Sequence, residues 1–175
     1  ELSWRGEKTE ASAYYTLMWN QRKFDDFYRD WYRDRNDSRH KLTLMLKHKF
    51  TKRFEVYGCW NWRTGNRMTV ESHYAENTES DQYDYMTHFP VYSEPNNLQL
   101  PDYHRLDLGL NFHKTTKRGN LSTWNLSIYN VYCRTNVVFA YLSSEYDDNG
   151  NFVKYIGEGL GMIPIIPTFS YTLKF

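Results

Sequence analysis

Residues 103–114 read YHRLDLGLNFHK, and this stretch decides the expected fold. Its even-numbered positions from 106 to 112 are apolar, and most of its odd-numbered positions are polar. The apolar set is Leu106, Leu108, Leu110 and Phe112. The residues that alternate with this apolar set are Arg105, Asp107, Gly109, Asn111 and His113. A period of two is typical of a β-strand and does not fit the 3.6-residue period of a helix.

The length of this alternation separates two kinds of β-protein. Strands of soluble proteins are usually about five or six residues long. A strand that crosses a membrane needs about 9 to 11 residues, with one face apolar toward lipid and the other polar toward a lumen. Residues 103–114 have both the length and the two faces, so they predict a wall strand of a transmembrane antiparallel β-barrel.

Composition is compatible with this expectation. The 175 residues suit one domain, the mean hydropathy is −0.82, and no apolar run approaches the roughly 18 residues of a membrane helix. Low hydropathy does not exclude a barrel, because only alternate strand residues face lipid and long loops are polar. The 16 Tyr, 10 Phe and 6 Trp suit the aromatic girdles at the two membrane interfaces.

Charge and motifs exclude several other classes. The net charge of +1 comes without a basic block, so no nucleic-acid partner is expected. Cys59 and Cys133 have no metal-site or disulfide-framework spacing, and a bond between them cannot be read from the sequence. No Gly-x-Ser-x-Gly motif or paired nucleophile and base is found, so neither catalytic residues nor enzyme activity are expected.

The longest connection contains residue types that could bind a metal. This connection contains two histidines and two aspartates, namely His73, Asp81, Asp84 and His88. Their spacing matches no established ligand pattern. The sequence therefore predicts no metal and no cofactor.

Five further stretches alternate in the same way and bring the expected wall strands to about six. They are residues 11–20, 40–50, 54–63, 121–132 and 167–175. Residues 1–10 show no clear pattern and are left unassigned. A hairpin is expected within 138–157, with Asn149-Gly150 as its turn.

The connections alternate between long and short. Residues 21–39, 64–102 and 134–164 form long connections, whereas 51–53 and 115–120 form short turns. Outer-membrane barrels combine short periplasmic turns with long extracellular loops. The rhythm predicts that the long loops face outward and that the short turns and the C-terminus face the periplasm.

Candidate ligand contacts are aromatic and charged residues of the long loops, which could stack on and hydrogen-bond a polar ligand. They are Trp31, Tyr32, Arg35, Tyr83, Tyr85 and Tyr146. The simpler alternative is that these side chains pack the loops or are solvated. Arg105, Asp107 and Asn111 are expected to face the lumen, where they would line a plug or a water path; more simply, they are the polar half of the alternation.

Several stretches resemble the C-terminal barrel region of TonB-dependent outer-membrane receptors, of the type common in Bacteroidetes. The stretches are NDSRHKL (36–42), TGNRMT (64–69), LPDYHRLDLGLNF (100–112), LSIYNVYCRTNVVFAYL (126–142) and PTFSYTLKF (167–175). The similarity runs from about Ala11 to the end. It departs from the family at Asn136-Val137, where relatives commonly have Asn-Pro, and the ending is less like that of glycan-importing receptors with a surface lipoprotein.

The resemblance implies a function and a set of partners. Such receptors have about 22 strands and enclose a plug domain. Residues 1–175 would then form the C-terminal part of one outer-membrane barrel domain, without the plug and the N-terminal strands. The implied function is active uptake of a scarce nutrient: a siderophore, haem, cobalamin, a peptide or a glycan. The implied partners are the rest of the barrel and its plug, the TonB energy-transducing complex, outer-membrane lipids and, in the glycan-importing branch, a surface lipoprotein.

Three alternatives remain open from the residues alone. A self-contained eight-stranded barrel with a structural or adhesive role would need the 138–157 hairpin to supply two wall strands. An outer-membrane barrel enzyme lacks a recognisable nucleophile. A soluble sandwich does not explain the regular long and short connections.

Overall fold

The computed structural model describes residues 1–76, 88–150, 152–161 and 164–175. Strands account for 65% of the structure, and the described residues contain no helix. The prediction of an all-β protein is therefore confirmed. Within these residues, no helix is long and apolar enough to cross a membrane.

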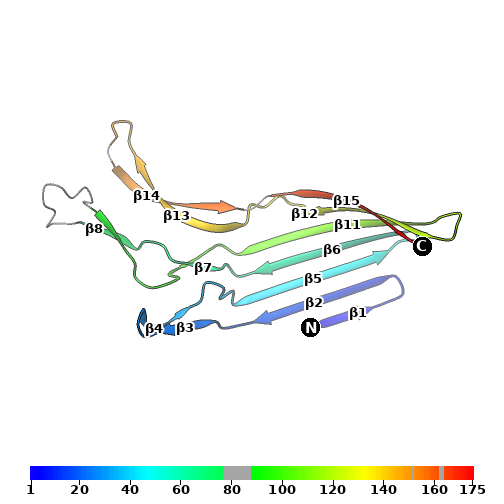
Figure 1. Cartoon of the computed structure of the whole chain (residues 1–175), viewed down its shortest axis with the longest axis horizontal. Coiled ribbons are helices and arrows are strands. Elements are labelled where there is room, and N and C mark those ends of the chain that lie inside the picture. Colours follow the sequence, from blue (N-terminus) through cyan, green and yellow to red (C-terminus); the bar gives the residue numbers. More distant parts are fainter. Residues whose placement is uncertain (77–87, 151, 162–163) are drawn as a thin grey trace.

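One antiparallel sheet of seven strands forms the body of the molecule (Figure 1). In spatial order its strands are β1 (Leu2–Arg5), β2 (Thr9–Leu17), β5 (His40–Lys49), β6 (Phe54–Arg63), β11 (Tyr103–Thr115), β12 (Leu121–Tyr129) and β15 (Ile166–Lys174). The spatial order of the strands follows their order in the chain, so the sheet is a meander with long connections between some of its strands. Among the described residues β1 and β15 each leave one edge unpaired, and the sheet does not close into a barrel.

Four two-stranded sheets occupy the long connections. They pair β3 (Gln21–Phe24) with β4 (Tyr28–Arg33), β7 (Arg67–Met68) with β10 (Leu98–Gln99), β8 (His73–Glu76) with β9 (His88–Val91), and β13 (Val137–Tyr146) with β14 (Phe152–Gly161). Figure 1 shows all of them at one end of the main sheet, with the short turns and the C-terminus at the other. The alternation of long and short connections in the sequence thus corresponds to two different ends of the main sheet.

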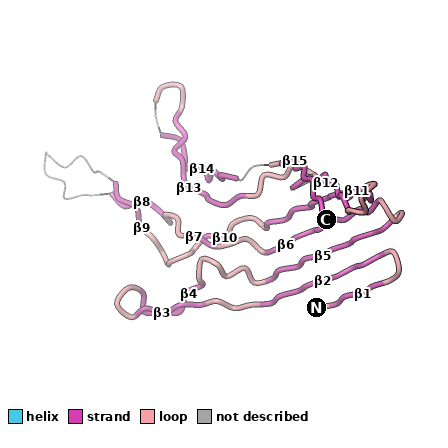
Figure 2. The backbone as a smooth tube through the Cα atoms, turned by 45° about the vertical axis from the view of Figure 1, so that its right-hand side comes forward, coloured by secondary structure: helices cyan, strands magenta, loops and turns pink. Residues whose placement is uncertain are grey.

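The expected strands agree with the observed ones to within three residues at each end, and the structure adds one strand. The sequence left residues 1–10 unassigned, whereas Leu2–Arg5 forms β1 and pairs with β2. The main sheet therefore has seven strands rather than about six. The expected hairpin exists as β13 and β14, with Gly150 at a positive φ of 82° in its turn. It pairs only with itself and stands apart from the main sheet (Figure 2).

The cross-strand register gives the sheet two chemically different faces. One row of directly paired residues crosses all seven strands and is apolar throughout: Trp4, Ala11, Leu46, Gly58, Leu108, Ile128 and Pro167. The next row lies on the opposite face and is polar or glycine: Arg5, Glu10, Lys47, Tyr57, Gly109, Ser127 and Thr168. Adjacent residues point to opposite faces of a sheet, so these rows define an apolar face and a polar face.

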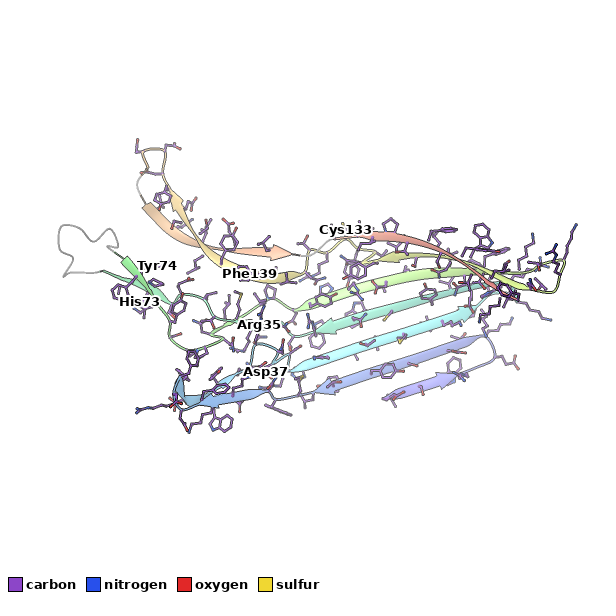
Figure 3. The ribbon with its side chains drawn as sticks, in the orientation of Figure 1. Arg35, Asp37, His73, Tyr74, Cys133 and Phe139 are labelled. Atoms are coloured by element: carbon purple, nitrogen blue, oxygen red, sulfur yellow. The ribbon has the colours of Figure 1, made fainter. Side chains whose placement is uncertain are left out.

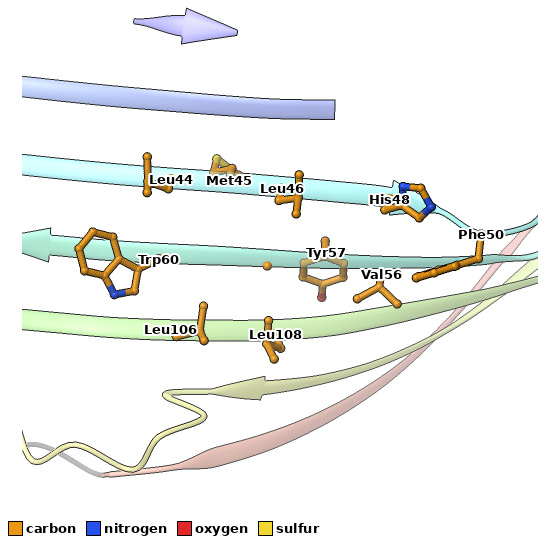
Figure 4. Close-up of a pocket in the computed structure, with 11 residues that line it drawn as sticks. Leu44, Met45, Leu46, His48, Phe50, Val56, Tyr57, Trp60, Leu106 and Leu108 are labelled. Carbon is orange, nitrogen blue, oxygen red and sulfur yellow. The ribbon is translucent and has the colours of Figure 1, made fainter. Parts of the chain in front are cut away.

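The apolar face is exposed. Leu46 is 54% exposed and Phe169 60%, while the described buried hydrophobic residues, Tyr32 and Leu100, both lie in the long connections. Glu55, in contrast, is buried on the polar face. This distribution reverses the usual pattern, in which large apolar side chains are inside and carboxylates outside. A shallow apolar hollow of about 380 Å³ has a lining that includes Leu46, Trp60 and Leu108 (Figure 4).

The polar face is tied together by side-chain contacts. Glu55 accepts a hydrogen bond from Asn111 Nδ2 at 2.8 Å and forms an ion pair with Lys47 at 3.2 Å. Asn125 Nδ2 donates to Asn111 Oδ1 at 2.6 Å and to the Tyr57 hydroxyl at 3.0 Å. These contacts join β5, β6, β11 and β12, so the polar groups of this face largely satisfy one another.

Candidate functional site

The predicted ligand-contact residues lie in different environments. Trp31, on β4, is 66% exposed, whereas Tyr32 beside it is only 7% exposed. Arg35 is exposed just after β4 (Figure 3), and Tyr146 is exposed at the end of β13. The remaining two, at positions 83 and 85, lie outside the described residues. A ligand role for all six stays a prediction, and Arg35 borders a cleft in the long connections.

This cleft has a volume of about 270 Å³ and draws its walls from all three long connections. Its lining residues are Arg35, Asn66, Arg67, Met68, Thr69, Asn96, Leu100, Val138 and Phe139. Arginine, amide and hydroxyl groups make one part of the wall, and Met68, Leu100, Val138 and Phe139 make an apolar part. We refer to it below as the loop cleft.

Backbone contacts between distant segments build the loop cleft. Arg67 N donates to Arg35 O at 2.9 Å, and Leu100 N donates to Asn66 O at 2.9 Å. A Cβ at Gly65 would overlap the Leu100 carbonyl, so only glycine allows this close approach. The loop cleft therefore has a fixed backbone frame.

Asp37 lies two residues beyond Arg35 and fixes the segment that carries it (Figure 3). Its side chain is fully buried and accepts hydrogen bonds from Arg33 Nε at 2.5 Å and Asn20 N at 3.1 Å. Burial by itself raises the pKa of the Asp37 carboxyl, but the contacts with Arg33 and Asn20 outweigh it, so the pKa lies below its usual value. The carboxylate is therefore charged at neutral pH and holds the segments before β3 and after β4 together.

The electrostatics of the loop cleft favour an anion. No carboxylate lines it among the described residues, and the exposed Arg35 guanidinium has no hydrogen-bond or ion-pair partner there. Burial and nearby Arg33 lower the pKa of Arg67, while Asp37 and Glu94 act in the opposite direction. Arg67 Nη1 donates to Asn96 O at 3.0 Å, and its buried Nε has no partner. A carboxylate or phosphate group would compensate these charges.

The residues expected to face the lumen lie on the polar face. Arg105 forms an ion pair with Asp107 at 2.9 Å and stacks over the Tyr129 ring, with the guanidinium carbon 4.0 Å from the ring centroid. Asn111 belongs to the Glu55 network described above. A second hollow, of about 420 Å³, lies beside Arg105 and is also bordered by Lys41 and Arg63. All three lie on the polar face, and the prediction that they face a lumen stays a prediction.

Sequence reasoning missed most of the loop cleft. It singled out Arg35 but not Arg67, Asn96 or Phe139, because nothing in the sequence indicates that these three meet. The signal closest to them is Gly65 within TGNRMT, a glycine positioned where two segments must approach. The metal candidates Asp81 and Asp84 lie outside the described residues, so the structure does not bear on that set.

Comparisons of the chain with protein-family models, with curated proteins and with solved structures found no match.

Proposed function

We propose that this chain is part of the wall of an outer-membrane β-barrel receptor of the TonB-dependent type, which takes up a scarce nutrient. One observation carries the proposal: an apolar row and a polar row, each continuous across seven strands, lie on opposite faces of one sheet. A sheet with this arrangement suits a barrel wall between lipid and a polar lumen.

Strand length and aromatic positions support the membrane assignment. Apart from β1, the strands of the main sheet have 9 to 13 residues, which matches the 9 to 11 residues of a tilted membrane strand. On the apolar face, Tyr15, His40 and Trp62 form a stacked aromatic band at the end with the long connections. Phe50, Phe54, Trp124 and Tyr171 gather at the other end. Two such bands are expected at the two membrane interfaces.

The open sheet supports a larger barrel. An unpaired strand edge in lipid leaves backbone groups without partners at several kcal/mol each, so β1 and β15 would need further strands. In the proposed receptor those strands belong to the rest of the barrel. The short turns would face the periplasm and the long connections the exterior, as in other outer-membrane barrels.

Within this proposal the loop cleft contributes to ligand capture. Arg35 and Arg67 would bind an anionic group of the ligand, while Phe139 and Val138 would contact an apolar part. The ligand classes remain a siderophore, haem, cobalamin, a peptide or a glycan. Uptake would depend on the plug and on the TonB complex, and Arg105, Asp107 and Asn111 would line the lumen.

An uptake assay tests the proposal. Cells that produce the native polypeptide carrying this sequence are supplied with labelled members of each ligand class, with and without a protonophore. We expect uptake of one class to need both the protein and the proton gradient. A correctly inserted protein whose deletion changes no uptake would contradict the receptor role.

Substitution in the loop cleft sharpens this assay. Arg35→Gln with Arg67→Gln should weaken ligand binding by at least tenfold, because a charge-assisted hydrogen bond contributes about 1.5–3 kcal/mol. Arg29→Gln is the matched control, since Arg29 is exposed on β4 and does not line the cleft. Equal binding by both variants would remove the loop cleft from the proposal.

The second candidate is a self-contained eight-stranded barrel with a structural or adhesive role. It is disfavoured by β13 and β14, which pair with each other and not with the main sheet. Intact-mass measurement of the polypeptide from outer-membrane extract separates the two. A mass several times 21.2 kDa is expected for the receptor, whereas a mass near 21.2 kDa would favour the small barrel.

A further inference from the structure

Basic side chains outnumber acidic ones at the end of the main sheet that carries the short turns. They come from the turns themselves and from the adjoining strand ends. They are Lys8, Lys49, Lys52, Arg53, Lys114, Lys117, Arg118 and Lys174, and we call them the basic rim. Glu7 is the acidic residue of the turn between β1 and β2.

The basic rim is exposed and unpaired. All of its residues are exposed, and none has an ion-pair partner among the described residues. Basic residues slightly farther from the turns behave differently: Lys47 is paired with Glu55 at 3.2 Å and Arg5 with Glu10 at 3.6 Å. The rim charges are therefore available to a partner outside this chain.

Acidic residues occupy the tips of two hairpins at the opposite end of the molecule. The turns of the two described hairpins β3–β4 and β13–β14 contain Asp25 and Asp26, and Asp147 and Asp148. The tips of these two hairpins are thus acidic, whereas the short turns at the other end are basic. Such a separation orients a molecule relative to a charged surface.

The basic rim adjoins an aromatic band of the apolar face. Phe50 and Phe54 have ring centroids 5.8 Å apart at the turn between β5 and β6, and Trp124 packs against Tyr171 at 5.0 Å. Lys114 lies two residues beyond Phe112 on β11, hence on the same face. Aromatic rings followed by exposed cations are the arrangement expected where acyl chains give way to lipid headgroups.

We propose that the basic rim binds the phosphate groups of anionic phospholipids in the leaflet that contacts the short turns. The inference rests on the membrane insertion proposed above and adds a lipid class to it. Phosphate complements the unpaired ammonium and guanidinium groups, and each cation near an anionic leaflet strengthens binding about fivefold. An acidic protein partner at the rim is the competing occupant, and the test distinguishes it.

The experiment measures lipid preference at equilibrium. The native polypeptide carrying this sequence is inserted into phosphatidylcholine vesicles, and insertion is checked by protection of the strands from protease. Spin-labelled phosphatidylglycerol and phosphatidylcholine are then compared for the immobilised fraction at the protein surface. We expect a severalfold preference for phosphatidylglycerol at 0.1 M salt that nearly disappears at 1 M salt, where the Debye length falls to about 3 Å.

Matched variants locate the preference. Lys52→Gln, Lys117→Gln and Arg118→Gln together should abolish most of it. The control triple Lys23→Gln, Arg29→Gln and Lys154→Gln removes the same kinds of charge from the opposite end and should leave it unchanged. Both triples replace exposed residues outside the main-sheet ladders, so both proteins should insert.

The possible outcomes separate this inference from the proposal on which it rests. Failure to insert into any vesicle would contradict the barrel assignment itself. Normal insertion without lipid preference would overturn the lipid site and leave the rim to an acidic protein partner. The lipid site would also be overturned if the triple variant of the basic rim kept the preference for phosphatidylglycerol, or if only the control triple variant lost it.

Discussion

Gly109 and Tyr57 form a direct pair between β11 and β6, with the tyrosine ring over the glycine. A Cβ at position 109 would overlap the ring, so the tyrosine occupies the space that a side chain would need. In this position the Tyr57 hydroxyl accepts a hydrogen bond from Asn125 on β12. The glycine that interrupts the polar half of YHRLDLGLNFHK is thus explained by packing.

Gly109→Ala should therefore destabilise the sheet by about 1–3 kcal/mol, the usual cost of overpacking. The measurement is the free energy of unfolding in urea, followed by tryptophan fluorescence in detergent micelles. Gly157→Ala on β14 is the control and should stay within about 0.5 kcal/mol, because nothing lies within 4 Å of a Cβ there. Equal stability of both variants would refute the packing role of Tyr57.

Asp37 gives the long connections a dependence on pH. Its pKa is lowered in the folded protein, so its contribution to stability is complete above the usual carboxyl pKa near 4 and is lost as pH falls through the lower folded value. Asp37→Asn should therefore open the β3–β4 region at neutral pH and weaken its acid dependence.

Hydrogen exchange at the Asn20 amide, which donates to Asp37, measures this opening. At pH 7 the variant should exchange about tenfold or more faster, because a hydrogen bond to a charged group contributes about 1.5–3 kcal/mol. Asp25→Asn is the control, since Asp25 is largely exposed and forms only a surface ion pair with Lys23. Unchanged exchange in Asp37→Asn would contradict the anchoring role.

At the scale of elements, the sequence was most informative where alternation is long. β5, β6 and β11 were predicted to within one residue at each end. Each of these strands alternates between an apolar and a polar face over ten or more residues, which leaves little ambiguity about where the strand begins and ends. β1 was missed because its four residues are too few to show a period and are defined by pairing with β2. Short strands depend on partners that a local pattern does not contain.

The loop cleft was less predictable for a related reason. Arg35 was singled out from its local composition, whereas Arg67, Asn96 and Phe139 meet it only through contacts between three separate connections. Asn136 is another example: its side-chain amide both donates to and accepts from the backbone of His104, as a neighbouring strand would. Such long-range contacts leave no periodic trace in the sequence.

The β13–β14 hairpin should be dispensable for the main sheet, because its strands pair only with each other. Replacing residues 138–160 with a short Gly-Ser linker should lower the strand content only by the hairpin's own residues and should preserve membrane insertion, as measured by circular dichroism and protease protection. Replacing β12 and its turn should abolish both. Loss of insertion without the hairpin would instead favour the eight-stranded barrel, in which these strands belong to the wall.

At the scale of the whole molecule, the polarity of the sheet is the feature that the proposed function must explain. Leu108, between Asp107 and Gly109, belongs to an apolar row that reaches from Trp4 to Pro167 without interruption. In water such a continuous exposed surface would drive aggregation or burial against another layer. In a barrel wall it contacts acyl chains.

Spin-label accessibility along β11 tests this assignment most directly. Single cysteines replace Leu106, Asp107, Leu108, Leu110 and Asn111 in a protein whose Cys59 and Cys133 are serine. After insertion of the native polypeptide into vesicles, collisions with oxygen and with a water-soluble nickel chelate are compared. We expect frequent collisions with oxygen at the three leucine positions and infrequent collisions with oxygen at the two polar positions. Leucine positions that neither reagent reaches would show that another protein layer covers the apolar face, and would contradict the barrel assignment.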